Sequence, residues 1–258
     1  MKVVLLAGGF GTRLAEETDI KPKPMVEIGG RPILWHIMKL YSHYGFNEFI
    51  VCLGYKGYVI KEYFANYFLH MADVTFDLSN NGMTVHQKHA EPWKVTLVDT
   101  GQNTKTGGRI KRVRDYVKNE TFMATYGDGL SDQNLRKLLE FHRAHGKLGT
   151  MTTVQPSGRF GVVDIQPDKH ISAFVEKPRG DGAWINGGFF VFEPEIFDRI
   201  DGDDTILEKR PLEGLAADGE LMAYEHDGFW KPMDTLREKH EFEDLWASTK
   251  APWKVWND

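Results

Sequence analysis

Three glycines and an arginine follow the first apolar run of the chain, in the segment Gly8-Gly9-Phe10-Gly11-Thr12-Arg13. Glycines let the backbone approach a ligand closely and let several N–H groups point at one anion. The guanidinium group of Arg13 has a fork of donors that suits phosphate oxygens. Two common phosphate loops are excluded: Leu14 stands where a dinucleotide-binding loop has its third glycine, and no Gly-Lys-[Ser/Thr] of a Walker A loop follows. We therefore predict a phosphate-binding loop of another kind, with a tight structural turn as the alternative.

A second group of charges comes shortly afterwards, in Lys21-Pro22-Lys23-Pro24-Met25. Prolines on both sides of Lys23 stiffen the backbone and bias the lysines away from helical conformations. A cation held on a stiff loop beside a phosphate site suits the stabilisation of charge that develops during a reaction. The alternative is a solvated connector, which explains the prolines but not their position after the glycine loop.

Two aspartates are candidate ligands of a divalent metal ion. Asp128 lies between two glycines at the expected end of a strand, and Mg²⁺ favours a few carboxylates together with phosphate oxygens. An ordinary Asp-Gly turn is the alternative for Asp128. Asp234 precedes Thr235 and a helical pattern, so its own surroundings favour an N-cap. The two aspartates lie far apart in the chain, and their spacing alone does not show that they converge.

Three further segments have polar groups that could line a ligand site. Glu176-Lys177-Pro178 holds a lysine at the end of an expected strand, with a plain hairpin end as the alternative. Asn186 and Gly187 offer an amide and a small residue, which suit a wall beside a hexose. The loop 101–109 has donors and acceptors for a pyrimidine, and a helix expected from Thr106 could take an anion at its start. An ordinary polar loop explains 101–109 equally well.

These segments need a scaffold, and the apolar pattern of the first two-thirds of the chain predicts one. Short apolar runs alternate with amphipathic stretches, which is typical of an α/β fold with a mostly parallel sheet covered by helices. One helix is expected over 32–44, ended by Gly45, and another from a cap at Ser131 or Asp132 to Gly146. The expected strands are 2–6, 48–53, 95–99, 121–126 and 149–154.

The last third of the chain has a different pattern of apolar and polar residues. Its expected elements are a β-hairpin of 161–165 and 171–175, a strand over 188–192, a helix opened by 193–195 and a last helix over 235–248. No linker, low-complexity tract or internal repeat divides the chain. We therefore expect one domain over 1–258.

Composition and charge exclude several classes of protein. The 258 residues are 41% hydrophobic and 27% charged, which is ordinary for a soluble globular protein. The net charge of −5 argues against a nucleic-acid-binding surface. The one cysteine, Cys52, excludes an intrachain disulfide and lies in an apolar run, so a buried thiol is expected. No apolar stretch is long enough to span a bilayer, and we expect a cytoplasmic protein without membrane contacts.

Two aromatic features are expected to be structural. The pair His86-x-x-His89 lacks a third ligand pattern, so solvent-facing histidines are expected rather than a zinc site. Trp253 and Trp256, in the tail, are expected to pack on the body or on a neighbouring subunit.

With these motifs the chain resembles the sugar-phosphate nucleotidyltransferases. Their signature of a hydrophobic strand, Gly-Gly-x-Gly-Thr-Arg-Leu and a later Pro-Lys-Pro is present at 6–14 and 22–24, and the resemblance extends over nearly the whole chain. It implies a Rossmann-like fold of the nucleotide-diphospho-sugar transferase type, with late β-hairpin insertions. It also implies a nucleotide-binding part at 1–155 and a sugar-phosphate-binding and C-terminal part at 156–258. The chain also looks like the family members that use CTP and glucose 1-phosphate. This likeness lies in the stretches 7–18, 99–101, 106–110 and 230–235.

The resemblance implies roles for the charged residues singled out above. Arg13 would hold the triphosphate, and Lys23 would contact the phosphates during transfer. Asp128 and Asp234 would bind Mg²⁺, which makes Arg13, Lys23 and Asp128 the expected catalytic residues.

Substrate contacts are implied in the same way. Lys177 would contact the sugar phosphate and Glu176 the sugar hydroxyls, while Thr104 and Arg109 would contact CTP. The other expected substrate-binding residues belong to the glycine loop and the hexose wall: Leu6, Ala7, Gly8, Gly9, Gly11, Thr12, Asn186 and Gly187.

The reaction that the resemblance implies is an in-line attack of glucose 1-phosphate on the α-phosphorus of CTP, with pyrophosphate as the leaving group. Two alternatives stay open: an enzyme of the same family that uses UTP or dTTP, and a non-catalytic sensor of nucleotides or sugar phosphates. The family context also implies a homo-oligomer, such as a hexamer, and a role in supplying dideoxy sugars for cell-surface polysaccharide.

Overall fold

In the described part of the chain the central sheet has seven strands, in the order β14-β10-β13-β8-β1-β4-β7. This computed structural model describes residues 1–86, 90–156, 162–175 and 183–257. The strands are β1 (Lys2–Leu6), β4 (Glu48–Leu53), β7 (Lys94–Asp99), β8 (Phe122–Tyr126), β10 (Gly149–Val154), β13 (Ile185–Phe192) and β14 (Leu221–His226). All five strands predicted for the first two-thirds of the chain are confirmed to within one residue.

The direction of the strands decides which segments meet at one edge of this sheet. Strands β8, β1, β4 and β7 are parallel, so their carboxyl ends lie together. Strand β13 is antiparallel to β8, with Phe189 opposite Thr125, so the beginning of β13 reaches that same edge. The glycine loop, Asp128 and Asn186 therefore share the edge where ligands bind in open α/β sheets. The predicted mostly parallel α/β fold is confirmed.

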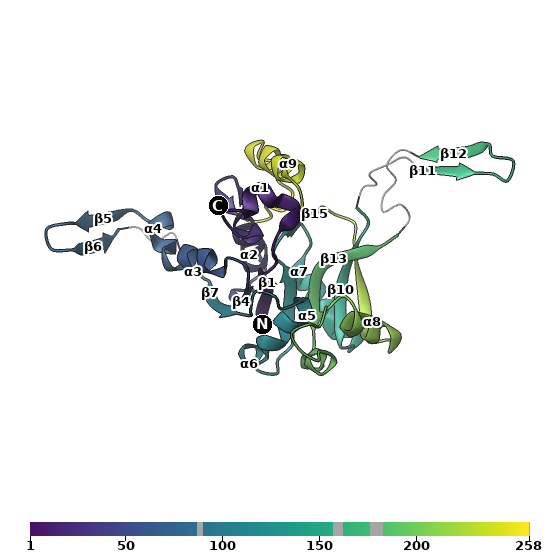
Figure 1. The fold of residues 1–258 in the computed structure, drawn as a ribbon, viewed down its shortest axis with the longest axis horizontal. Coiled ribbons are helices and arrows are strands. Elements are labelled where there is room, and N and C mark those ends of the chain that lie inside the picture. Colours follow the sequence, from purple (N-terminus) through teal and green to yellow (C-terminus); the bar gives the residue numbers. More distant parts are fainter. Residues whose placement is uncertain (87–89, 157–161, 176–182, 258) are drawn as a thin grey trace.

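Helices cover both faces of the sheet (Figure 1). Helices α2 (Ile33–His43), α7 (Leu135–His145) and α9 (Leu236–Ala247) pack on one face, and α5 (Thr106–Arg112), α6 (Arg114–Val117) and α8 (Arg210–Ala217) on the other. Successive strand residues point to opposite faces. Consequently Val3 and Leu5 of β1 belong to one core, and Val4 and Leu6 to the other. Strands buried on both faces explain the continuous apolar runs.

The cap of α7 differs from the prediction. Asn134 is the N-cap, and its side-chain oxygen accepts hydrogen bonds from the N–H groups of Arg136 and Lys137. The predicted caps Ser131 and Asp132 are wrong, because Ser131 is the last residue of the short strand β9 (Gly129–Ser131), which comes before the helix turn.

The cap of α9 is Thr235, one residue after the aspartate that the local sequence favoured. Thr235 and Glu238 form a capping box, in which each side chain bonds to the backbone N–H of the other residue. The expectation of an N-cap at Asp234 is therefore wrong. The carboxylate of Asp234 is left to make other contacts.

Two β-hairpins project from the body on opposite sides (Figure 1). One consists of β5 (Val74–Asp77) and β6 (Gly82–Val85) and follows α3 (Gly57–Ala65) and α4 (Tyr67–Met71). The other consists of β11 (Val162–Ile165) and β12 (Ile171–Val175). We call them the 74–85 arm and the 162–175 arm. The second hairpin was predicted from the sequence, whereas the first was missed because its strands are short and lack a continuous apolar run.

Smaller elements complete the fold. They are β2 (Glu27–Ile28), β3 (Arg31–Pro32), β15 (Trp230–Pro232), α1 (Ala15–Thr18) and the 3-10 helices Thr12–Leu14, Lys23–Met25 and Pro194–Arg199. In the tail Trp253 is fully buried and its ring contacts those of His36 and Phe242, which confirms packing on the body. Over the described ranges, every helix is too short or too polar to cross a lipid bilayer.

Candidate active site

A cavity of about 660 Å³ opens at the edge of the sheet where these strand ends meet. It is lined by the glycine loop, by the segment that follows β8 and by the start of β13. The full lining is residues 6–13, 23–24, 102–106, 109, 125–129, 186–189, 206, 208, 230, 232 and 234. Most of the predicted site residues therefore face one cavity, although they come from distant parts of the chain. Glu176 and Lys177 lie outside the described residues.

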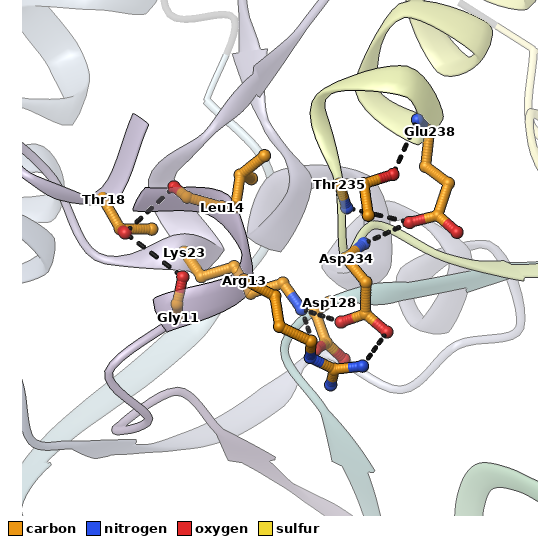
Figure 2. Close-up of polar contacts among 9 residues, drawn as sticks. All are labelled: Gly11, Arg13, Leu14, Thr18, Lys23, Asp128, Asp234, Thr235 and Glu238. Atoms are coloured by element: carbon orange, nitrogen blue, oxygen red, sulfur yellow. Dashed lines mark hydrogen bonds and ion pairs between the residues drawn. The ribbon is translucent and has the colours of Figure 1, made fainter. Parts of the chain in front are cut away.

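Lys23 lies between two carboxylates at one end of this cavity. Its Nζ atom is 2.6 Å from Oδ2 of Asp128 and 2.6 Å from Oδ1 of Asp234. A guanidinium nitrogen of Arg13 is 2.8 Å from Oδ2 of Asp234. Figure 2 shows both cations directed at the carboxylates. The arrangement concentrates two positive and two negative charges within hydrogen-bonding distance.

The position of Lys23 follows from its own segment and from the glycine loop. Lys23 opens a 3-10 helix between two prolines and is only 8% exposed, so its backbone has little freedom. Gly11, with φ of +66°, packs against it: a Cβ at Gly11 would lie 2.8 Å from Cγ2 of Thr18 and 3.1 Å from Cβ of Lys23. The hydroxyl of Thr18 donates to the carbonyls of Gly11 and Leu14, which holds the loop in this shape (Figure 2).

A short strand pairing brings the two aspartates together. Strand β9 pairs with β15 in antiparallel fashion, with Gly129 opposite Pro232. The pairing continues one step further, since the N–H of Met233 donates to the carbonyl of Asp128 at 2.8 Å. Asp128 and Asp234 are thereby neighbours at the end of a two-stranded ladder. No sequence pattern indicated this pairing, because each strand has three residues.

Arg109 is buried beneath the glycine loop, with 4% of its surface exposed. Its guanidinium group donates to the carbonyls of Gly8, Leu53, Gly101 and Gln102 and to the hydroxyl of Thr100, over 2.7 to 3.1 Å. Burial lowers the pKa of Arg109 from its usual value. In this structure Arg109 ties the glycine loop to the loop after β7, and its direct contact with CTP stays a prediction.

The start of α5 packs closely against the segment that precedes α8. A Cβ at Gly108 would lie 2.5 Å from the backbone of Asp203, and one at Gly107 would lie 2.8 Å from the carbonyl of Thr205. Glycines are therefore needed there for close packing. Thr104, one of the predicted CTP contacts, lies on the cavity side of this junction and is 8% exposed.

Another wall of the cavity is formed at the start of β13. The side-chain amide of Asn186 donates to the hydroxyl of Tyr126 at 3.3 Å, and its oxygen accepts from the N–H of Gly188 at 2.8 Å. The indole N–H of Trp230 donates to the carbonyl of Gly187 at 2.6 Å. Gly188, with φ of +76°, packs against the ring of Tyr126 so closely that a Cβ would overlap it.

Sequence reasoning missed Glu208, which also lines the cavity. Its carboxylate accepts hydrogen bonds from the hydroxyls of Tyr126 and Thr106, the latter at 2.6 Å. Glu208 stands in Ile206-Leu207-Glu208-Lys209, which locally resembles an ordinary solvent-exposed turn. Only its tertiary contacts distinguish it from the other glutamates.

The structure also shows the surroundings of Cys52 and His86, for which the sequence predicted no role in a site. Cys52 is fully buried in a core, and burial raises the pKa of its thiol to about 12, which confirms a structural thiol. His86 bonds to the hydroxyl of Thr75 across the 74–85 arm, while His89 lies outside the described residues. No group of three or more potential metal ligands of the His, Cys, Asp or Glu type occurs within the described ranges.

Comparisons with known proteins agree with this geometry. The family model for nucleotidyl transferases matches residues 2–231. The chain is 63% identical to glucose-1-phosphate cytidylyltransferase of Salmonella typhi, over 99% of this chain and 100% of the relative. It is 46% identical, over the same shares, to the probable glucose-1-phosphate cytidylyltransferase of Bacillus subtilis (strain 168). The crystal structure of HddC from Yersinia pseudotuberculosis has the same fold, with a TM-score of 0.69, 24% identity and coverage of 95% of this chain and 99% of that one.

Proposed function

The chain belongs to the nucleotidyl transferase family, and on that basis we propose that it transfers CMP from CTP to glucose 1-phosphate. The products are CDP-glucose and pyrophosphate. The observation that supports these substrates is the 63% identity to a glucose-1-phosphate cytidylyltransferase over the full length of both chains. Arg13, Lys23, Asp128 and Asp234 around one cavity supply the charges that such a transfer needs.

The transfer needs no covalent intermediate with the protein. A phosphate oxygen of glucose 1-phosphate forms a bond to the α-phosphorus of CTP, and the bond from that phosphorus to the bridging oxygen of the β-phosphate breaks. Catalysis then consists of orientation and charge stabilisation. Arg13 and the glycine loop hold the triphosphate, and Lys23 stabilises the charge that grows on the departing pyrophosphate.

The two aspartates fit a single Mg²⁺ ion. Mg²⁺ binds hard oxygen ligands and is usually held by one or two carboxylates together with substrate phosphates. Asp128 and Asp234 offer such a pair, and the ammonium group of Lys23 between them shows that their position suits a cation. When bound, Mg²⁺ would neutralise charge on the phosphates of CTP. We assign Asp128 and Asp234 as its ligands on this ground.

The remaining assignments concern the substrate contacts. Thr104 and Arg109 contact CTP, and Asn186 with Gly187 forms the wall beside the glucose. Glu176 and Lys177 follow β12 in the chain, and we assign them to the sugar hydroxyls and to the sugar phosphate, as the family resemblance implies. These substrates also lead us to propose that the protein acts in the cytoplasm.

Turnover with different nucleotides tests the proposal. With glucose 1-phosphate and Mg²⁺, pyrophosphate release should be faster with CTP than with UTP, dTTP or GTP, and chromatography should identify CDP-glucose. CDP-glucose and pyrophosphate should also give CTP back, because one phosphoanhydride replaces another. A higher kcat/KM with UTP or dTTP would reassign the base. Binding of CTP without pyrophosphate release would favour a sensor.

We also propose that the two arms join copies of the chain into a homo-oligomer. Phe76, Leu78 and Met83 of the 74–85 arm are 58%, 90% and 57% exposed. Ile171 and Phe174 of the 162–175 arm are 58% and 63% exposed. Apolar side chains gathered on projecting hairpins are costly in water and typical of contact surfaces. A hexamer is one assembly that projecting arms of this kind allow.

The arms give a direct test of assembly. Replacing Phe76 and Leu78 by serine should lower the mass measured by light scattering, because apolar contacts between copies are lost. The control is Tyr116→Ser on α6, which removes a large exposed side chain outside the arms, at a residue that is 45% exposed. A monomeric wild-type protein, or a variant with unchanged mass, would contradict the role of this arm.

A further inference from the structure

Three carboxylates line the cavity over the described ranges, and one of them differs from the other two in its partners. Asp128 and Asp234 are bound to Lys23, and Asp234 also to Arg13. The partners of Glu208 are two hydroxyl groups, those of Tyr126 and Thr106. Among the residues that the structure describes, no lysine or arginine forms an ion pair with Glu208.

The groups around Glu208 are neutral. The hydroxyl of Tyr126 donates a hydrogen bond to the carboxylate of Glu208. Asn186 donates to the same phenol, and the hydroxyl of Thr106 accepts from the N–H of Leu207 at 2.9 Å. We call Thr106, Tyr126, Asn186 and Glu208 the Glu208 cluster. Its charge is that of one carboxylate.

This charge determines what the Glu208 cluster can bind. A carboxylate with no cation among its described partners repels phosphate groups, so we expect the triphosphate to bind beside Arg13 and Lys23 and not beside Glu208. A carboxylate has about four lone-pair sites, and the two hydroxyls occupy two of them. The free sites can accept hydrogen bonds from neutral donors. In a sugar phosphate and a nucleotide, the most abundant neutral donors are sugar hydroxyls.

The position of the Glu208 cluster favours the hexose as the source of those hydroxyls. Asn186 is the second residue of β13, and the next two residues, Gly187 and Gly188, have no side chains that would fill the space beside it. Gly187 lines the cavity, and its carbonyl accepts a hydrogen bond from the indole N–H of Trp230, which fixes the backbone there as a wall of the cavity. A pyranose ring fits beside such a wall, with its hydroxyls toward Glu208 and Asn186.

We propose that Glu208 is a specificity residue of this site, and this proposal rests on the proposed function. The carboxylate of Glu208 accepts a hydrogen bond from a ring hydroxyl of the sugar phosphate. Tyr126 and Thr106 hold the carboxylate in place, and Asn186 contributes a second polar group to the same wall. The ribose of the nucleotide has the same chemistry and is the other source of a hydroxyl. Kinetics with the two substrates distinguish these sources.

The variant Glu208→Gln tests the proposal with the least disturbance of the fold. Glutamine has the same length, can accept from Tyr126 through its oxygen and can donate to Thr106 through its amide. A hydrogen bond to a charged group contributes about 1.5–3 kcal/mol, so the KM for glucose 1-phosphate should rise by about 10-fold or more. The KM for CTP should change by less than about twofold, because the triphosphate is held elsewhere.

Deoxy analogues identify the hydroxyl. The wild-type protein should discriminate against the monodeoxy glucose 1-phosphate that lacks the contacted hydroxyl, and Glu208→Gln should lose that discrimination for this analogue alone. A merely structural role would change the parameters of every analogue by the same factor. Glu208→Asp, which keeps the charge, should recover part of the discrimination. Glu213→Gln is the matched control, since Glu213 is an exposed residue of α8 outside the cavity.

Three results would overturn the proposal. Unchanged binding of glucose 1-phosphate by calorimetry in Glu208→Gln would remove Glu208 from the sugar site. A raised KM for CTP, with lost discrimination against 2′-deoxy-CTP, would assign the carboxylate to ribose instead. An equal loss with every deoxy analogue would make Glu208 structural. Failure of the proposed function is a separate result, namely that the wild-type protein forms no nucleotide sugar from CTP.

Discussion

Replacing Lys23 by alanine should lower kcat for CDP-glucose formation by about 10²–10³, the usual cost of removing one preorganised electrostatic contact. The ammonium group of Lys23 is held by a stiff segment and by two carboxylates within the cavity. A cation that is already oriented needs no reorganisation when charge develops on the leaving pyrophosphate. The KM for CTP should change less than kcat, because Arg13 and the glycine loop still bind the triphosphate. Steady-state pyrophosphate release measures both parameters.

The same variant should bind divalent metal better in the absence of nucleotide. The Nζ atom of Lys23 lies within 2.6 Å of both carboxylates, so it competes with a metal ion for the same oxygens. Each hydrogen bond between charged groups contributes about 1.5–3 kcal/mol, so Mn²⁺ should bind Lys23→Ala at least about 10-fold more tightly than the wild-type protein. The electron paramagnetic resonance signal of free Mn²⁺ measures this binding without any turnover. CTP should reduce the difference, because its phosphates attract both Lys23 and the metal.

Lys21→Ala is the control for both measurements. Lys21 stands in the same segment, two residues before Lys23, and pairs with Glu27 at 3.0 Å. It lies outside the lining of the cavity, so its loss should leave kcat and Mn²⁺ affinity near their wild-type values. Equal Mn²⁺ binding by the wild-type protein and Lys23→Ala would show that Lys23 does not compete with metal. Wild-type turnover of Lys23→Ala would remove Lys23 from catalysis.

Asp128→Asn should also lower kcat by about 10²–10³, because it removes one of two carboxylates that face the metal and the phosphates. Asparagine keeps the size of the side chain and can still accept a hydrogen bond from Lys23. A neutral hydrogen bond to Lys23 replaces a charged one, so the free energy of unfolding should fall by only about 1–2 kcal/mol. Thermal unfolding and turnover, measured on the same preparation, separate the two effects. Asp198→Asn, at an exposed residue outside the cavity, is the control.

The double variant Asp128→Asn/Asp234→Asn shows whether the carboxylates act as a pair. If they hold one ion, the double variant should be little slower than either single variant, because groups that act as a unit have non-additive effects. Mn²⁺ binding in the presence of CTP should be lost in all three variants. Losses in kcat that multiply would mean that the two aspartates act separately, and normal Mn²⁺ binding would place the metal elsewhere.

Local sequence was enough to predict the scaffold. Strands such as 48–53 were predicted within a residue because they are buried on both faces, which requires a continuous apolar run that is visible in the sequence. The helix over 32–44 was predicted by its apolar period and the glycine after it. Errors arose where several polar residues could cap the same helix. Asn134 rather than Ser131 caps α7, because Ser131 is held in β9 by its pairing with β15.

The phosphate end of the site was also visible in local sequence. Glycines in the loop and prolines around Lys23 are demanded by backbone geometry, namely a positive φ at Gly11 and a stiff segment beside it. Such demands restrict the residue type at single positions, so one sequence reveals them. The family resemblance added the roles of these residues, and the identity to curated relatives supports the substrates.

What this sequence determined by itself is therefore the set of strands and helices and the glycine and lysine loops, since each depends on neighbouring residues. The tertiary structure decided which side chains meet. A pairing of two three-residue strands joins Asp128 to Asp234, and the antiparallel direction of β13 brings Asn186 to Tyr126. The same holds for Glu208, whose partners Thr106 and Tyr126 precede it by 102 and 82 residues. Contacts over such distances depend on how whole strands and helices pack, and this packing leaves no pattern in the residues on either side.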